Sequence, residues 1–113
     1  MYGTTDGCGL AAGTVFAINT DGSGFTTLYN FTSLSGTNSS GAYTNSDGAY
    51  PGAGLILSGN TLYGTAEYGG SSGVGTVFSV NTDGTGFTTL YSFTNGSDGA
   101  RPFAGLILSG DTL

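Results

Sequence analysis

Two long blocks of the sequence occur twice in nearly the same form. The first joins Gly-Thr-Val-Phe, Asn-Thr-Asp-Gly and Gly-Phe-Thr-Thr-Leu-Tyr; it occupies residues 13–29 and returns at 75–91. The second is Gly-Leu-Ile-Leu-Ser-Gly, at 54–59 and again at 105–110. Repetition on this scale is typical of folds in which each unit buries its apolar faces against further copies of the unit. The repeats therefore predict a stacked architecture and association between units.

The composition favours strands and excludes two classes of partner. The 23 glycines argue against helices, whereas seven Tyr, seven Phe and many Thr, Val and Ile favour pleated strands. One Arg against seven acidic residues leaves a net charge of −6, so the chain lacks the basic side chains that neutralise phosphates. We therefore expect no nucleic-acid partner. No apolar run approaches the roughly 20 residues of a membrane-spanning helix, so no membrane partner is expected either.

The two copies predict two repeats within a single module. Repeat one covers residues 1–62, with strands over 2–5, 14–20, 25–32 and 55–58; repeat two covers 63–113, with strands over 61–66, 75–82, 87–94 and 106–109. Gly59-Asn60 and Asp83-Gly84 supply the turns, since glycine tolerates the positive φ that tight turns require.

Large apolar side chains are expected on both faces of these strands. Along the last strand of the intact copy, Phe87, Tyr91 and Phe93 alternate onto one face and Leu90 onto the other. Burial of both faces in four-stranded units of about 50 residues is typical of stacked propeller blades. A β-sandwich, the alternative, buries one face of each sheet and gains nothing from a near-identical repeat. We predict an all-β β-propeller of four-stranded antiparallel blades, two blades' worth per chain.

The two ends of the sequence match two parts of one unit. Residues 109–113 followed by 2–4 correspond to 58–65, so one blade is intact over 55–94 and the other is divided between 2–32 and 105–110. We expect the inner strand of one copy to complete the divided blade of another; the residues expected to meet are Tyr2, Gly3, Thr4, Leu106, Ile107 and Leu108. Propellers typically have four to eight blades. The predicted partner is therefore the chain itself, in a closed ring of two to four copies without free edges.

The repeated motifs resemble those of a known family. The run Gly-Leu-Ile-Leu-Ser-Gly-Asn-Thr-Leu-Tyr-Gly-Thr at 54–65, then Gly69-Gly70 and the Gly-Thr-Val-Phe segment at 75–84, resembles the GloVer-type (Gloeobacter/Verrucomicrobia-type) tandem-repeat family. The resemblance implies a propeller-like β fold and a parent protein at the bacterial cell surface or outside the cell. It implies no catalytic residue, and the chain is similar to a two-repeat fragment, natural or engineered.

The sequence offers no catalytic or metal-binding set. There is no His, Glu67 is the only Glu, and Cys8 has no basic residue near it in the sequence. The segments 19–22 and 81–84 begin like a calcium loop, but the acidic ligand that such a loop needs further on is missing. Asp-Gly turns explain both segments. We expect no enzyme, no cofactor and no metal.

Any ligand site is expected on the loops. The long links 33–53 and 95–104 are predicted to emerge on the same rim as the loops 6–12 and 67–74. The candidate rim residues are Tyr43, Asp47, Tyr50, Glu67, Tyr68, Asp98 and Arg101. Tyr rings beside amide and carboxylate groups suit sugars, so a carbohydrate-binding module of an extracellular protein is the alternative to a non-catalytic scaffold. Packing of the links between blades is the simpler explanation of these residues.

Overall fold

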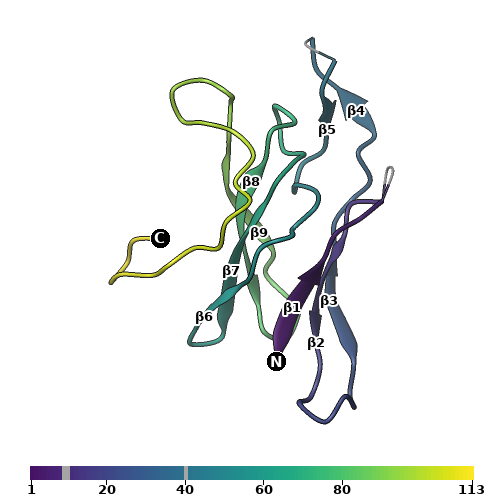
Figure 1. The fold of residues 1–113 in the computed structure, drawn as a ribbon, viewed down its shortest axis with the longest axis vertical. Coiled ribbons are helices and arrows are strands. Elements are labelled where there is room, and N and C mark those ends of the chain that lie inside the picture. Colours follow the sequence, from purple (N-terminus) through teal and green to yellow (C-terminus); the bar gives the residue numbers. More distant parts are fainter. Residues whose placement is uncertain (9–10, 40) are drawn as a thin grey trace.

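The protein is all-β, with every strand pair antiparallel. The computed structural model describes residues 1–8, 11–39 and 41–113, and no helix occurs in them. The first sheet contains β1 (Tyr2–Thr5), β2 (Thr14–Ala17) and β3 (Thr26–Asn30), in that order. The second sheet has the order β6 (Ile56–Ser58), β7 (Thr61–Ala66), β8 (Thr76–Asn81) and β9 (Thr88–Ser92). The two sheets lie side by side (Figure 1), and the predicted fold class is confirmed at this level.

The predicted strands 2–5 and 61–66 form with the predicted bounds, the others form with shorter bounds, and one does not form. Residues 106–109 form no strand, because no neighbouring strand pairs with them within the described chain; that prediction is wrong for a single copy. The long first link instead contains an unpredicted hairpin, β4 (Gly36–Thr37) with β5 (Tyr43–Thr44). The second sheet runs from 56 to 92, so β7 crosses the repeat boundary predicted after residue 62. The described residues form no closed ring of sheets.

A β-bulge in each sheet changes which side chains share a face. The register between β8 and β9 shifts between Val77 and Phe78, so Val77 pairs with Tyr91 whereas Phe78 pairs with Thr89. Leu90 is the additional residue, and an additional residue inverts the alternation of all side chains beyond it. Phe87 and Tyr91 therefore lie on opposite faces, which corrects the prediction that they share one. The first sheet has the same shift between Val15 and Phe16.

Each sheet consequently has two unlike faces. The Phe face carries Phe16 and Phe25 in the first sheet and Phe78 and Phe87 in the second, and the two rings stack on each other in both cases. The opposite Tyr face carries Val15 and Tyr29 in the first sheet and Val77 and Tyr91 in the second.

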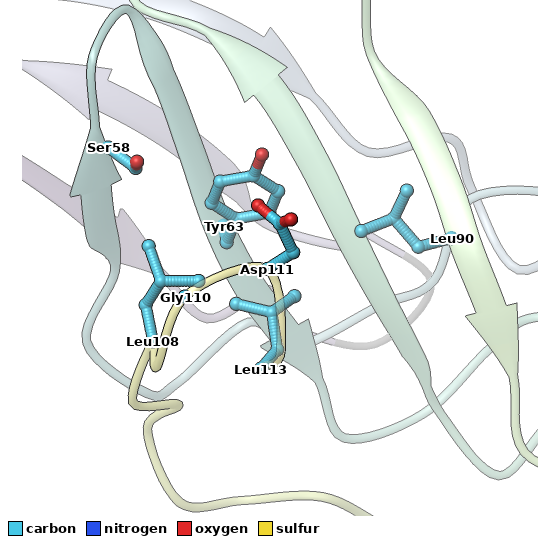
Figure 2. A pocket seen from close by; sticks show the side chains of 7 residues that line it. All are labelled: Ser58, Tyr63, Leu90, Leu108, Gly110, Asp111 and Leu113. Carbon is cyan, nitrogen blue, oxygen red and sulfur yellow. The ribbon is translucent and has the colours of Figure 1, made fainter.

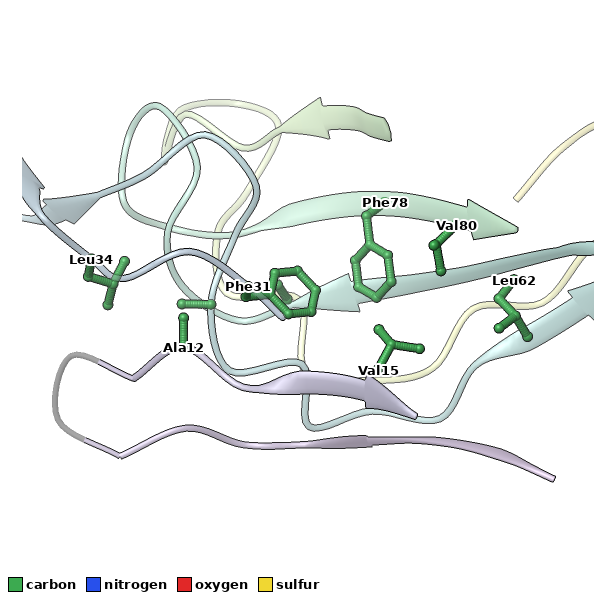
Figure 3. Close-up of a cluster of buried hydrophobic side chains, with 9 residues drawn as sticks. Ala12, Val15, Phe31, Leu34, Leu62, Phe78 and Val80 are labelled. Atoms are coloured by element: carbon green, nitrogen blue, oxygen red, sulfur yellow. The ribbon is translucent and has the colours of Figure 1, made fainter. Parts of the chain in front are cut away.

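The core lies where the Tyr face of the first sheet packs on the Phe face of the second. Val15 and Phe31 approach Leu62, Phe78 and Val80 there (Figure 3), and all five side chains are buried. Burial of such side chains contributes about 1.5–3 kcal/mol each. This interface uses one face of each sheet, so the Phe face of the first sheet and the Tyr face of the second have no sheet packed on them in the described chain.

Candidate assembly interface

β1 has one unpaired edge. Its residues 2–5 pair with β2 on one side, and no strand of the described residues lies on the other side. In the second sheet the corresponding strand, β7, is covered on that side by β6. An unpaired edge presents backbone N–H and C=O groups that can bind another strand. Three of the predicted closure residues, Tyr2, Gly3 and Thr4, thus lie on an open edge.

The last nine residues, 105–113, contain an unpaired copy of β6, and we call them the arm. Residues 105–110 have the same sequence as 54–59. Ile107 is nevertheless 83% exposed, and its neighbour Leu108 is also exposed. Leu106 is half-buried. The other three predicted closure residues therefore lie in a segment that presents apolar side chains without strand pairing.

The turn that follows the unpaired segment is already formed. Ser109 and Thr112 donate backbone N–H groups to each other's carbonyl oxygens at 2.8 and 2.9 Å. Gly110 has a φ of 59°, and Gly59 in the turn between β6 and β7 has the same value. Glycine adopts this left-handed φ without the steric cost that a Cβ brings. The arm therefore has the same turn conformation as the hairpin of β6 and β7.

The chain reaches the arm by the same route that it takes to β6. The hydroxyl of Thr4 donates to the carbonyl of Ala53 at 3.1 Å, and the hydroxyl of Thr65 donates to that of Ala104 at 3.3 Å. The two bonds fix the links at equivalent strands, β1 in the first sheet and β7 in the second. The arm thus leaves the second sheet as residues 54–58 leave the first.

The arm lies against the Tyr face of the second sheet. A cavity of about 350 Å³ separates them, lined by Ser58, Tyr63, Leu90, Leu108, Gly110, Asp111 and Leu113 (Figure 2). Leu113 is 40% exposed there, whereas Leu62, its counterpart after β6, is 1% exposed. Leu62 is covered because the first sheet packs over it. No sheet of the described chain covers Leu113.

The two long links are each fixed by one carboxylate. Asp47 is 3% exposed and accepts hydrogen bonds from the hydroxyl of Tyr29 at 2.7 Å and from the backbone N–H and hydroxyl of Thr32 at 2.9 and 2.6 Å. Burial and the bond to the Asp47 carboxylate raise the pKa of Tyr29 well above its ordinary value of 10.0.

Asp98 repeats this arrangement closer to the surface. Its carboxylate accepts from the hydroxyl of Tyr91 at 2.7 Å and from the backbone N–H and hydroxyl of Thr94 at 3.1 and 2.8 Å. These donors lower the pKa of Asp98, with the Tyr91 bond first, because they stabilise its charged form. The residue order Tyr-x-x-Thr followed by Asp-Gly is duplicated in the sequence, and it is the signal from which the two contacts could have been found.

The structure brings together some of the predicted rim residues. Tyr50 meets the ring of Tyr68 edge-on at 5.5 Å, and the guanidinium of Arg101 lies 4.9 Å above the same ring. Tyr43, Tyr68 and Arg101 border one hollow of about 220 Å³. The carboxylates of Asp47 and Asp98 hold the links instead, as described above. Glu67 contributes its backbone N–H, which donates to the carbonyl of Tyr50 at 3.2 Å.

The remaining candidate groups are turns and a surface thiol. Asp21 and Asp83 each accept from the residue two positions on, which makes them turn carboxylates. Cys8 is exposed; the next residues of its loop, 9–10, and residue 40 in the first long link lie outside the described residues. Residues 1–8, 11–39 and 41–113 include no cluster of three or more His, Cys, Asp or Glu placed to bind a metal ion. They also include no helix of the length and apolarity needed to cross a membrane.

Comparison with known proteins identifies no relative. A scan against protein-family models, a search of the curated proteins and a search of the solved structures each found no match. The resemblance to the GloVer-type repeat stays a prediction.

Proposed function

We propose that the chain is a non-catalytic β-propeller repeat module that assembles with copies of itself into a closed ring and acts as a structural scaffold. One observation carries the proposal. The pairing of β6 with β7 within the chain shows how the arm of one copy would pair with β1 of the next, and we call this pairing the template. The arm has the sequence and turn of β6, and the free edge of β1 corresponds to the edge of β7 that β6 covers. In the described chain the arm and β1 do not pair with each other.

The template fixes the register of the proposed contact. Ile56 pairs with Tyr63 in the second sheet. The equivalent pair between copies is Ile107 with Tyr2, and its side chains lie on the same face of the joint sheet. A shift of one residue would place them on opposite faces. The proposal therefore specifies individual residue pairs, which makes it testable by cross-linking.

Disulfide cross-linking tests the pairing directly. In a Cys8→Ser background, Ile107→Cys with Tyr2→Cys places two thiols opposite each other, and Cα atoms of paired residues lie about 4.5–5.5 Å apart, within disulfide range. The matched control, Leu106→Cys with Tyr2→Cys, points its thiols to opposite faces, because Leu106 lies one position before the paired residue. We expect covalent oligomers from the first variant and far fewer from the control.

The size of the covalent product also tests closure. A closed ring yields one discrete species of two, three or four chains without free thiols, and native mass spectrometry of the unmodified protein should give the same number. An assembly that does not close into a ring yields covalent oligomers of many different sizes. A monomer at high concentration, or a disulfide formed within one chain, contradicts the proposal.

Carbohydrate binding at the hollow beside Arg101 is a second candidate function. It is favoured by one observation, the meeting of Tyr43, Tyr68 and Arg101 around about 220 Å³. Exposed Tyr rings can stack on the apolar faces of sugars. A glycan array at high protein concentration tests this function, with Tyr43→Ala as the variant expected to lose any signal.

A further inference from the structure

The contact between the two sheets is centred on four aromatic rings. Tyr29 and Phe31 come from the Tyr face of the first sheet, and Phe78 and Phe87 come from the Phe face of the second. Tyr29 stacks on Phe87 with ring centroids 3.8 Å apart and planes 5° from parallel. Phe31 meets Phe78 and Phe87 edge-on at 5.2 and 5.6 Å. We call this arrangement the four-ring cluster; each sheet contributes one half.

The second sheet carries an unused copy of the Tyr half. Tyr91 and Phe93 lie 5.3 Å apart with planes at 78°, on the face turned away from the first sheet. Tyr29 and Phe31 within the cluster lie 5.3 Å apart at 88°. The unused half therefore already has the ring geometry of the half that is in use.

The first sheet carries an unused copy of the Phe half. Phe16 and Phe25 are stacked at 5.4 Å with planes 29° apart, close to the 5.6 Å and 22° of Phe78 and Phe87 in the cluster. The end of the Phe16 ring lies over Gly3, where a Cβ would approach it to 2.6 Å. This ring position is the one that Phe78 takes over Gly64.

The unused halves are fixed in position although one ring of each is exposed. Tyr91 is 48% exposed, yet its hydroxyl donates to the carboxylate of Asp98 at 2.7 Å, as that of Tyr29 does to Asp47. Phe25 is 59% exposed and is held by its stack on Phe16. Rings that are already oriented lose little conformational freedom on binding, which favours association.

We propose that Tyr91 and Phe93 of one copy receive Phe16 and Phe25 of the next copy and form a second four-ring cluster between chains. This inference rests on the proposed function and identifies the faces that meet in it. The occupant is a second copy, because only the complementary half is missing and this chain presents it. The bulges place the two halves on opposite faces, so the contact is head-to-tail: each copy uses its Phe face toward one neighbour and its Tyr face toward the other.

Single substitutions in the two halves test the inference. Tyr91→Ala and Phe25→Ala each remove one ring that is exposed in the single chain and central in the proposed contact. We expect each to weaken the dissociation constant for self-association roughly 30-fold or more, as truncation of a central aromatic residue does. Tyr43→Ala removes another exposed Tyr that lies outside both faces, and it serves as the matched control. Its association should equal that of the wild type. Circular dichroism of dilute samples checks that all three variants are folded.

Mixing the two variants tests the head-to-tail geometry. A pair made of one Phe25→Ala copy and one Tyr91→Ala copy contains one intact contact, between the Tyr91 of the former and the Phe25 of the latter. The mixture should therefore form heterodimers that neither variant forms alone. If Tyr91→Ala associates like the wild type, or if mixing restores nothing, the inference is overturned.

The disulfide between positions 107 and 2 separates this result from the proposed function. If that disulfide still forms between copies while loss of Tyr91 has no effect on association, strand exchange stands and the aromatic contact does not. If wild-type chains fail to associate and the disulfide is absent, the proposed function fails, and the inference fails with it.

Discussion

Phe78 and Phe16 occupy the same position in the two sheets, so replacing each by Ala compares a filled interface with an open one. Phe78 is fully buried and contacts Phe31 and Phe87, with ring centroids 5.2 and 5.6 Å away. Truncation of a buried Phe costs about 3–5 kcal/mol, from lost transfer free energy and the cavity left behind. For a domain with a free energy of unfolding of about 5–15 kcal/mol, this is a large fraction. Phe78→Ala should lower the melting temperature by roughly 10–20 °C at any protein concentration.

Phe16→Ala should behave differently, because the ring of Phe16 has solvent on the side where Phe78 meets the first sheet. In dilute solution its loss should cost less than about 1.5 kcal/mol, since only its stack on Phe25 and its contact with Gly3 disappear. At high concentration the wild type should gain stability from the proposed association, because a partner that binds only the folded state stabilises that state. The variant should show no such gain.

Urea unfolding at two protein concentrations, followed by circular dichroism, measures both effects. The cost of Phe16→Ala should grow with concentration while that of Phe78→Ala stays constant. Equal destabilisation by the two variants in dilute solution would refute the reasoning, since it would mean that Phe16 is already covered within one chain. A cost of Phe16→Ala that is independent of concentration would refute it as well.

Three further predictions concern the hydrogen-bonded carboxylates. Asp47→Ala leaves the donors of Tyr29 and Thr32 without a partner and should lower the free energy of unfolding by about 3 kcal/mol, whereas the more accessible Asp98→Ala should cost measurably less in the same urea titration. The pKa of Asp98 is lowered, so its contribution to stability should be complete above the ordinary carboxyl value of 3.8 and be lost as the pH falls through the depressed value. Hydrogen exchange of the Thr94 N–H, which donates to Asp98, should therefore accelerate in acid. Asp98→Asn should abolish this pH dependence. The pKa of Tyr29 is raised, so its contribution to stability should be complete below the ordinary tyrosine value of 10.0 and be lost as the pH rises through the raised value. Tyr29→Phe should leave the absorbance change near pH 10 unaltered.

The sequence was informative where structure depends on neighbouring residues. β1 and β7 form with the predicted bounds, because alternating side chains and the adjoining Gly turns are local features. The strand predicted over 106–109 failed for a different reason. Its residues match those of β6, but a strand needs a partner for its backbone groups, and the single chain places none beside it.

The faces of the sheets could not be predicted from alternation alone. Phe87 and Tyr91 are four residues apart and should share a face, but the additional residue at Leu90 separates them. No Gly or Pro marks this bulge in the sequence, and the Thr-Thr-Leu-Tyr run would also fit a regular strand. The contacts of Asp47 and Asp98 were missed because they join segments whose separation differs between the two links, from Thr32 to Asp47 and from Thr94 to Asp98.

The bulge has a consequence for the shape of the proposed assembly. A sheet with two like faces could pair face to face with a second copy and stop at a dimer. Here each sheet has a Phe face and a Tyr face, so the proposed contact between copies is of the same kind as the contact between the two sheets of one copy. Because the unused half-clusters have nearly the ring geometry of the used ones, the angle between successive sheets should be nearly equal at both contacts. Equal rotations add in one direction, which favours closure after a fixed number of sheets. That number must be even, since every copy contributes two.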